Sequence, residues 1–168
     1  MNKDDIERYL KLLGEELQTK NAVGTILLLG GAVMLLEVGN RATTQDIDAS
    51  FEGSNAPLIR QAIEAVAQRE ELAQDWLNDA AKGFLYSQPK TVLWKHYPGL
   101  DVYIPSLDYL LAMKVVAGRP RDIEDARALI QKLHISDEYT LLSIITKYVP
   151  LERIDVRVQY LVADFFDS

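Results

Sequence analysis

The feature that most constrains the fold is a continuous apolar stretch that stops at two adjacent glycines. Residues 25–29 read Thr-Ile-Leu-Leu-Leu, and Gly30 and Gly31 follow directly. A β-branched start followed by leucines is typical of a strand buried on both faces. Residues 32–38 are then predicted to form a short helix. Glycines at the start of a helix let a ligand approach closely, and the backbone N–H groups there can hold a phosphate.

A second predicted strand carries two acidic residues on one face. Residues 46–51 alternate between polar and apolar, beginning with Asp46, Ile47 and Asp48. Side chains two positions apart in a strand point to the same face, with Cα atoms roughly 6.5 Å apart, so Ile47 is expected in the core. Two carboxylates this close repel each other, which makes a divalent cation such as Mg²⁺ their natural partner. The alternative is a solvated strand edge or a turn with capping acids.

The remaining periodicity predicts helices at both ends of the chain and a strand pair between them. Apolar residues at helical spacing predict an amphipathic helix around residues 6–17. Residues 92–94 and 100–104 flank a Tyr-Pro-Gly turn and are predicted to be an antiparallel pair. Further helices are predicted at residues 57–69, through 72–76, and at 107–117, 122–133, 136–148 and 152–166.

The expected fold class is therefore α+β, with a small mixed sheet, flanking helices and a helical C-terminal extension. The candidate boundary follows Ile104, which gives an αβ core of residues 1–104 and an extension, residues 105–168, packed on that core. The segment after the boundary is short and strongly helical, so we expect it to share the core rather than build its own.

Composition excludes several kinds of site. The chain has no cysteine, so disulfides, thiolate metal sites and cysteine nucleophiles are excluded. Its longest apolar run is too short to cross a bilayer and no signal peptide precedes it, so we expect a cytoplasmic protein with no membrane partner. The formal net charge of −7 argues against passive DNA coating. Divalent ions on clustered carboxylates would reverse the local field that a triphosphate meets.

Four motifs occur in an order that resembles the nucleotidyltransferase superfamily. They are Gly30-Gly31-Ala32, Arg41-x-Thr43-Thr44-x-Asp46-Ile47-Asp48, Leu110-Leu111-Ala112-Met113-Lys114 and Arg119-x-Arg121-Asp122-Ile123-Glu124-Asp125. More narrowly, they are similar to abortive-infection type toxins and their small bacterial relatives of unassigned function. The resemblance runs from about residue 27 to residue 133. It implies Mg²⁺ or Mn²⁺ held by Asp46 and Asp48, and a nucleoside triphosphate (NTP) whose phosphates lie over Gly30 and Gly31.

The resemblance also implies roles for residues outside the acid pair. A third carboxylate usually comes from a neighbouring strand, and Asp101 is the candidate, with a turn acid as the alternative. Lys114 would reach substrate phosphates or pair with an acid such as Asp122, whereas the alternative is a lysine that extends along its own stem to the surface. Asp122 is either the N-cap of the next helix or part of the site. Arg41 and Thr43 contact a phosphate or shape the loop.

Two functional hypotheses follow from the resemblance. In the first, the protein transfers a nucleoside monophosphate from an NTP to a protein or RNA hydroxyl, in a toxin–antitoxin or phage-defence setting. Its catalytic residues would be Asp46, Asp48, Asp101 and Lys114. In the second, the fold is catalytically degenerate and serves as a binding or antitoxin-like partner of a cognate toxin. Many members carry a Gly-Ser pair whose hydroxyl contacts a phosphate, whereas this chain has Ala32 after its glycines. The missing serine and the open question of the third acid motivate the second hypothesis.

Overall fold

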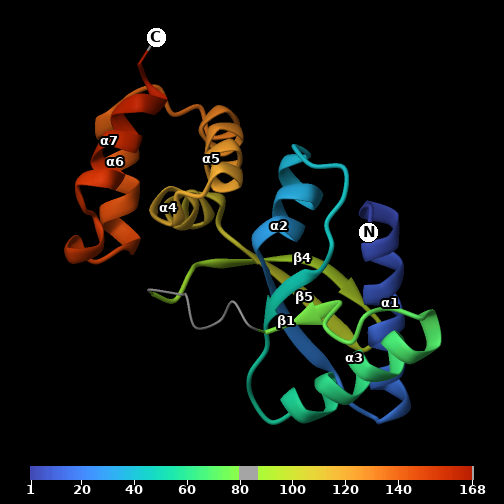
Figure 1. Ribbon diagram of the computed structural model, residues 1–168. Coiled ribbons are helices and arrows are strands. Elements are labelled where there is room, and N and C mark those ends of the chain that lie inside the picture. Colours follow the sequence, from blue (N-terminus) through green and yellow to red (C-terminus); the bar gives the residue numbers. More distant parts are fainter. Residues whose placement is uncertain (80–86, 168) are drawn as a thin grey trace. The chain divides into compact units, whose positions relative to one another are not determined.

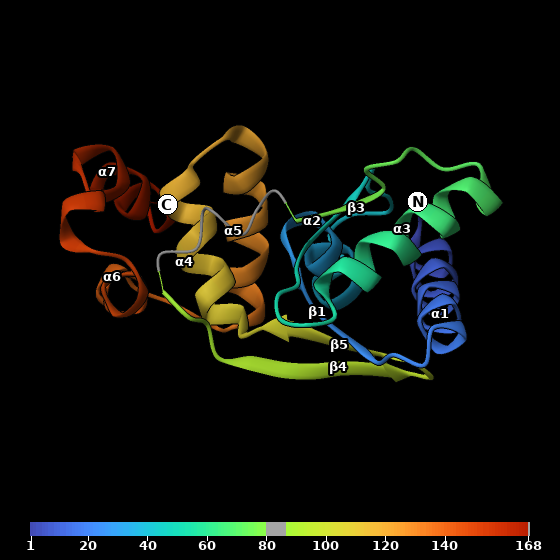
Figure 2. The ribbon, with the colours of Figure 1, turned by 90° about the horizontal axis from the view of Figure 1, so that it is seen from below.

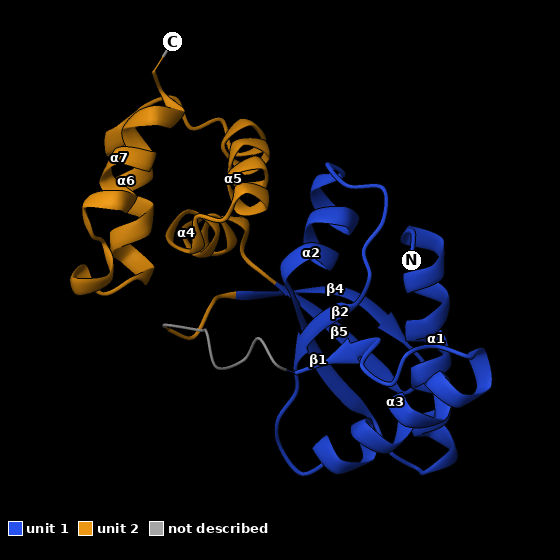
Figure 3. Ribbon diagram, viewed as in Figure 1, with its two compact units in different colours: residues 1–84, 91–104 blue, residues 85–90, 105–168 orange. Residues whose placement is uncertain are grey.

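The computed structural model describes residues 1–79 and 87–167 (Figure 1). The chain forms two compact units (Figure 3): described residues 1–79 and 91–104 make the first, and residues 87–90 and 105–167 make the second. The helices together with a five-stranded mixed sheet confirm the predicted α+β class. The packing of residues 105–168 on an αβ core stays a prediction. None of the helices described has the length and apolar character that a bilayer-spanning segment requires.

The first unit is built on a sheet with the strand order β3-β2-β1-β5-β4. The strands are β1 (Gly24–Leu29), β2 (Ile47–Ser50), β3 (Leu77–Asn78), β4 (Thr91–Tyr97) and β5 (Leu100–Pro105). Strand β1 pairs antiparallel with β2 and parallel with β5, and β2 pairs parallel with β3. Strands β4 and β5 are neighbours joined by a two-residue turn, which is the predicted antiparallel pair. The leucine-rich strand therefore lies at the centre of the sheet.

Two helices cover one face of this sheet. Helices α1 (Lys3–Thr19) and α3 (Ala56–Glu70) lie side by side (Figures 1 and 2). A Cβ on Gly24 would contact Leu17 of α1 and Ile59 of α3, so both helices meet the face of β1 that Gly24 shares with Ile26 and Leu28. Ile26 and Leu28 are fully buried.

The other face of β1 is less covered than the sequence predicts. Thr25 is exposed and Leu27 is half-buried, whereas burial on both faces was expected. An uninterrupted apolar run does not distinguish a doubly covered strand from one with a covered and an open face, because leucine is common in both environments. The side chain of Asp48 on β2 lies on this same, less covered face of the sheet.

The segment after α3 does not form the predicted helix through residues 72–76. Glu71 ends α3 in a left-handed conformation with φ of 55°, and the chain then turns into β3. Trp76 is buried in a T-shaped contact with the Tyr9 ring, and its indole N–H donates to the carbonyl oxygen of Ile63 at 3.0 Å. The apolar residues of the segment 72–76 therefore do not form a helix face, and Trp76 packs into the core beside β3.

The second unit is helical, as predicted. Its helices are α4 (Leu107–Ala117), α5 (Pro120–Lys132), α6 (Glu138–Tyr148) and α7 (Val156–Phe165), with the short 3-10 turn η3 (Leu151–Arg153) before the last. Leu111, Leu129 and Leu141 are fully buried, so three of the helices contribute to one apolar core. The last helix begins later than predicted because the Asp155 carboxylate caps it, accepting from the backbone N–H of Val158 at 3.0 Å.

Candidate functional site

The end of β1 forms a tight turn that lies against an acidic side chain. Gly30 starts α2 (Gly30–Val33) with φ of 61°, a left-handed conformation that residues with a Cβ rarely adopt. A Cβ on Gly30 would lie 3.1 Å from Oδ2 of Asp48. The strand register explains this closeness, because Leu29 is the partner of Asp48 in the β1–β2 pair. The structure thus brings together the glycine turn and the second acid of the predicted pair.

A basic side chain and a hydroxyl lie close to the second glycine, Gly31. A Cβ on Gly31 would lie 2.8 Å from Nη1 of Arg41 and 3.5 Å from Oγ1 of Thr44. The Thr44 hydroxyl also donates to the backbone carbonyl of Asp46 at 3.0 Å. Thr43, the sequence candidate, is exposed, so its neighbour Thr44 is the threonine that faces the turn. A guanidinium, a hydroxyl and the N–H groups of a helix start together suit an anionic group such as phosphate.

The helix after the glycines is irregular. Helix α2 ends at Val33 and continues as a π-helical turn, η1 (Met34–Val38). It begins at Gly30, two residues earlier than predicted. Ala32, Val33 and Met34 are buried, which fixes the start of the helix to the core behind the turn. The first N–H groups of a helix have no partner within the helix and can meet a ligand.

The two acids flank a residue that anchors β2. Ile47 is fully buried, as predicted, while Asp46 is exposed immediately before the strand and Asp48 is half-buried within it. Alternation along the strand therefore directs the Asp48 carboxylate away from the core, and Asp46 precedes the strand at an exposed position. Two carboxylates, supplemented by water and phosphate oxygens, form a set of ligands that suits Mg²⁺ or Mn²⁺. These residues therefore fit one divalent ion.

Asp101 shares the face of Asp48 but not its position along the sheet. Asp101 pairs in register with Thr25, whereas Asp48 pairs with Leu29. Four residues of strand separate the two levels, which is roughly 13 Å. Among the residues described, no three His, Asp or Glu side chains are grouped to hold a metal. Asp101 instead lies 2.5 Å from Nδ1 of His96 on β4. Alternation predicts the face correctly, but it does not determine register.

The second unit contains a buried ionic cluster around Lys114. Its ammonium lies 3.2 Å from Oδ1 of Asp122 and 2.9 Å from Oδ2 of Asp125. Lys114 is 7% exposed, and each acid is 1% exposed. The predicted pairing with Asp122 is therefore confirmed, and the alternative of a lysine that reaches the surface is wrong. The contact of Lys114 with a substrate phosphate stays a prediction.

Asp122 also stabilises the start of α5. The helix begins at Pro120, so Asp122 is its third residue rather than the predicted N-cap, and its Oδ2 accepts from the backbone N–H of Arg119 at 3.3 Å. The Arg119 side chain donates to the same carboxylate through Nε at 2.6 Å. Burial by itself raises the pKa of Asp122, but the Arg119 hydrogen bond and the Lys114 charge outweigh burial and hold that pKa below its ordinary value.

Asp125 is a cluster member that the sequence reading did not single out as a site residue. It lies three positions after Asp122, on the face of α5 that also buries Ala126 and Leu129. Two acids at helical spacing inside an apolar stripe are costly unless a cation is buried with them. This pattern, together with a lysine in the apolar helix before it, is the signal that predicts such a cluster.

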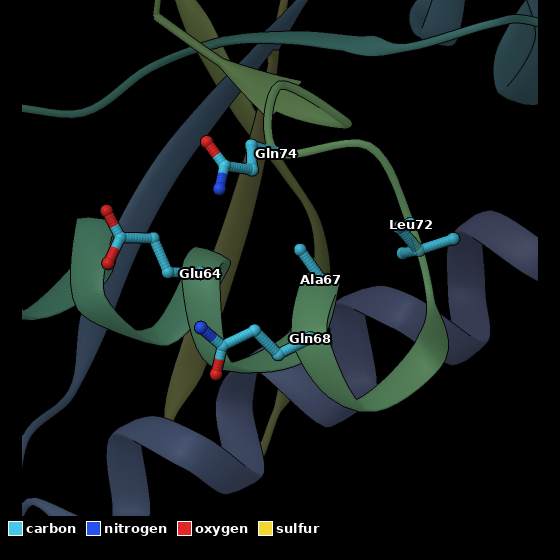
Figure 4. Close-up of a pocket in the computed structure, with 5 residues that line it drawn as sticks. All are labelled: Glu64, Ala67, Gln68, Leu72 and Gln74. Atoms are coloured by element: carbon cyan, nitrogen blue, oxygen red, sulfur yellow. The ribbon is translucent and has the colours of Figure 1, made fainter.

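A hollow on α3 is a separate surface feature of the first unit (Figure 4). Its volume is about 270 Å³. It is lined by Glu64, Ala67, Gln68, Leu72 and Gln74. Its lining includes a carboxylate and two carboxamides but no cation, and α3 covers the face of the sheet opposite Asp48. This hollow therefore does not suit a triphosphate.

Comparison with known families places the chain in a nucleotidyltransferase family. A family model described as nucleotidyltransferase of unknown function (DUF6036) matches residues 5–147, which is most of the chain. The chain belongs to this nucleotidyltransferase family. No curated protein and no solved structure matches the chain. The narrower resemblance to abortive-infection type toxins stays a prediction.

Proposed function

We propose that the protein is a metal-dependent nucleotidyltransferase that moves a nucleoside monophosphate from an NTP to a protein or RNA hydroxyl. The observation that carries this proposal is the closeness of the Gly30 turn and the Asp48 carboxylate. It places backbone N–H groups that could bind a phosphate next to a carboxylate that could bind a metal ion. The acceptor oxygen attacks the α-phosphorus and forms a phosphoester. The bond from that phosphorus to the bridging oxygen breaks, pyrophosphate leaves, and the acceptor proton passes to solvent.

Asp46 and Asp48 are the residues that would hold Mg²⁺ or Mn²⁺. Such an ion supplies charge neutralisation for the phosphates and makes the acceptor hydroxyl easier to deprotonate. Asp48 is held in place because Ile47 beside it is buried in the core. Asp46 is exposed and lies immediately before β2. The two acids would thus share the binding of one ion.

The glycine turn and its loop would bind the triphosphate. Gly30 and Gly31 present backbone N–H groups without a side chain in the way, and Arg41 adds a positive charge beside them. Thr44 supplies a hydroxyl beside Gly31, which would compensate for the serine hydroxyl that Ala32 lacks. Lys114 and Asp122 are proposed to maintain the ionic core of the second unit. Asp101 has no role in this proposal, since its register separates it from the pair.

The wider setting of the reaction comes from the narrower resemblance. Abortive-infection type relatives make a toxin–antitoxin or phage-defence role the proposed setting, with a cognate antitoxin as the protein partner. A second candidate function is a degenerate, antitoxin-like binding protein. The specific observation that favours it is that no third carboxylate joins Asp46 and Asp48 within the described chain.

An incorporation assay separates these functions. The purified protein is incubated with Mg²⁺, each α-³²P-labelled NTP, and total RNA or protein as acceptor. We expect label in the acceptor with the wild type, none with Asp48→Asn, and undiminished label with Asp101→Asn, which is the same substitution on the same face of the sheet. Full incorporation by Asp48→Asn would refute the assignment. Mg²⁺-NTP binding without any incorporation would favour the degenerate partner.

A further inference from the structure

We propose that Asn78 of β3 completes the metal and phosphate site by supplying a neutral oxygen beside Asp48. The inference rests on the proposed function and adds a residue to its site. Asn78 takes the place next to the acid pair for which the sequence suggested Asp101. It is a binding residue of a different chemical kind, because a carboxamide offers an oxygen ligand without a negative charge.

The strand register places Asn78 directly beside Asp48. In the parallel β2–β3 pair, Ile47 is the partner of Leu77 and Asp48 is the partner of Asn78. Partners on neighbouring strands lie about 4.8 Å apart and direct their side chains to the same face. Burial agrees with this pairing: Ile47 and Leu77 are 0% and 2% exposed, whereas Asp48 and Asn78 are both half-buried.

The three elements of the site form a row across one edge of the sheet. Strand β2 lies between β1 and β3. Leu29 at the end of β1, Asp48 on β2 and Asn78 on β3 are successive partners, and Gly30 follows Leu29 directly. The Asp48 carboxylate is therefore flanked by the glycine turn on one side and by a carboxamide on the other. A ligand bound to Asp48 meets both neighbours.

A turn contact orients the Asn78 carboxamide. Its Nδ2 donates to the backbone carbonyl of Asp75 at 3.3 Å. The oxygen and nitrogen branch from one carbon in different directions, so this bond turns Oδ1 away from the Asp75 carbonyl. Carboxamide oxygens are ligands for hard divalent cations and also accept hydrogen bonds from substrate hydroxyls. The hydrogen bond thus holds the carboxamide at the turn that leads into β3, and the strand register places it beside Asp48.

The neutral residue lowers the charge of the site. Asp46, Asp48 and Asn78 together provide two negative charges, whereas a third carboxylate would make three. Fewer charged ligands weaken the affinity for a bare ion, so a larger share of the binding has to come from the phosphates of the nucleotide. We therefore expect the site to bind the bare ion weakly and to bind it more tightly once the NTP is present.

Binding of Mn²⁺ alone, measured by the electron paramagnetic resonance signal of the free ion, tests this role. Asn78→Asp adds a carboxylate beside Asp48 and should tighten Mn²⁺ binding roughly 5- to 10-fold. Asn78→Ala should weaken Mn²⁺ binding in the presence of a non-hydrolysable NTP. The matched control is Asn21→Asp, the same change at an exposed position before the far end of β1, roughly 17 Å or more away. It should leave Mn²⁺ binding within about twofold of the wild type.

Asp48→Asn separates failure of this inference from failure of the proposed function. Loss of Mn²⁺ binding in Asp48→Asn, with equal affinities for Asn78→Asp and Asn21→Asp, would overturn the role of Asn78 alone. Unchanged Mn²⁺ binding in Asp48→Asn would overturn the proposed function itself. Melting curves establish that each variant is folded. If Asn78→Asp does not fold, Asn78→Ala decides, since unchanged Mn²⁺-nucleotide binding in that variant contradicts the inference.

Discussion

Single residues at the end of β1 depend on one another for their positions. Gly30 can adopt its left-handed conformation because it has no Cβ, and the same lack of a side chain leaves room for the Asp48 carboxylate. Arg41 uses the equivalent space on Gly31. Gly30 therefore has two roles, one in the backbone turn and one in admitting a charged group to the site, whereas Gly31 has the second role alone.

Gly30→Ala should both destabilise the protein and weaken metal binding. The left-handed conformation costs an alanine about 1 to 2 kcal/mol, and the new Cβ would press on Oδ2 of Asp48. Gly39 has φ of 75° and open space around its Cβ position, so Gly39→Ala is the matched control for the backbone strain. Urea denaturation should show a loss in both variants, whereas Mn²⁺ titration should weaken only for Gly30→Ala. Equal Mn²⁺ affinities would contradict the contact.

Removing the buried charge of Lys114 should have a large effect on stability. Lys114→Met leaves the carboxylates of Asp122 and Asp125 buried without their cation, which costs about 3 to 5 kcal/mol in the free energy of unfolding. Lys132→Met on α5 removes an exposed lysine and should cost less than about 1 kcal/mol. Chemical denaturation of both variants measures the difference. A similar, small loss in each would show that the cluster contributes little.

Elements in this protein are easier to predict from sequence than the contacts between them. Helical periodicity and strand alternation identify most helices and the alternating strand of the acid pair, because those patterns follow from local geometry. Register is different, since it depends on which strands pair and by how many residues they are offset. Asp101 has the expected face but the wrong level. Asn78 lies in a strand that no sequence pattern predicts, just after the predicted helix around residues 72–76. The pairing of β3 with β2 is a tertiary choice that local patterns do not contain.

The stability of the α4–α5 pair should depend on pH in the acidic range, through the Asp122 carboxylate. The pKa of Asp122 is lowered in the folded protein, mainly because the Arg119 hydrogen bond and the Lys114 charge outweigh burial. In the unfolded chain the pKa of an aspartate is about 3.9. Because the pKa of Asp122 is lower than this in the folded protein, the charged carboxylate stabilises the fold fully above that pH. This stabilisation is lost as the pH falls below about 3.9 toward the folded pKa. Below about pH 4, the free energy of unfolding should therefore fall less steeply for Asp122→Asn than for the wild type.

Urea denaturation at a series of pH values between neutral and strongly acidic measures this difference. Glu124→Gln, on the exposed side of the same helix, controls for the loss of one negative charge. Parallel curves for the wild type and Asp122→Asn below pH 4 would show that the Asp122 interactions do not favour its charged form.

The whole molecule carries a charge that opposes its proposed substrate. Its formal net charge is −7, and a triphosphate is strongly anionic. Arg41 at the glycine turn offsets this field locally, and bound divalent ions would reverse it at the acid pair. Nucleotide binding should therefore be coupled to the metal.

Removing divalent cations should weaken NTP binding by about tenfold or more. Isothermal titration of an NTP in Mg²⁺ and in excess EDTA, at constant ionic strength, measures the coupling. A nucleotide affinity that is the same in both conditions would mean that the triphosphate binds without an ion at the acid pair.

A crystal structure with Mn²⁺ and a non-hydrolysable NTP would show whether metal and nucleotide bind at the Gly30 turn. We expect an anomalous manganese peak roughly 2.0 to 2.3 Å from a carboxylate oxygen of Asp48, with the phosphates over Gly30 and Gly31. A nucleotide bound elsewhere in the protein, or a manganese ion without Asp48 among its ligands, would contradict the proposed site.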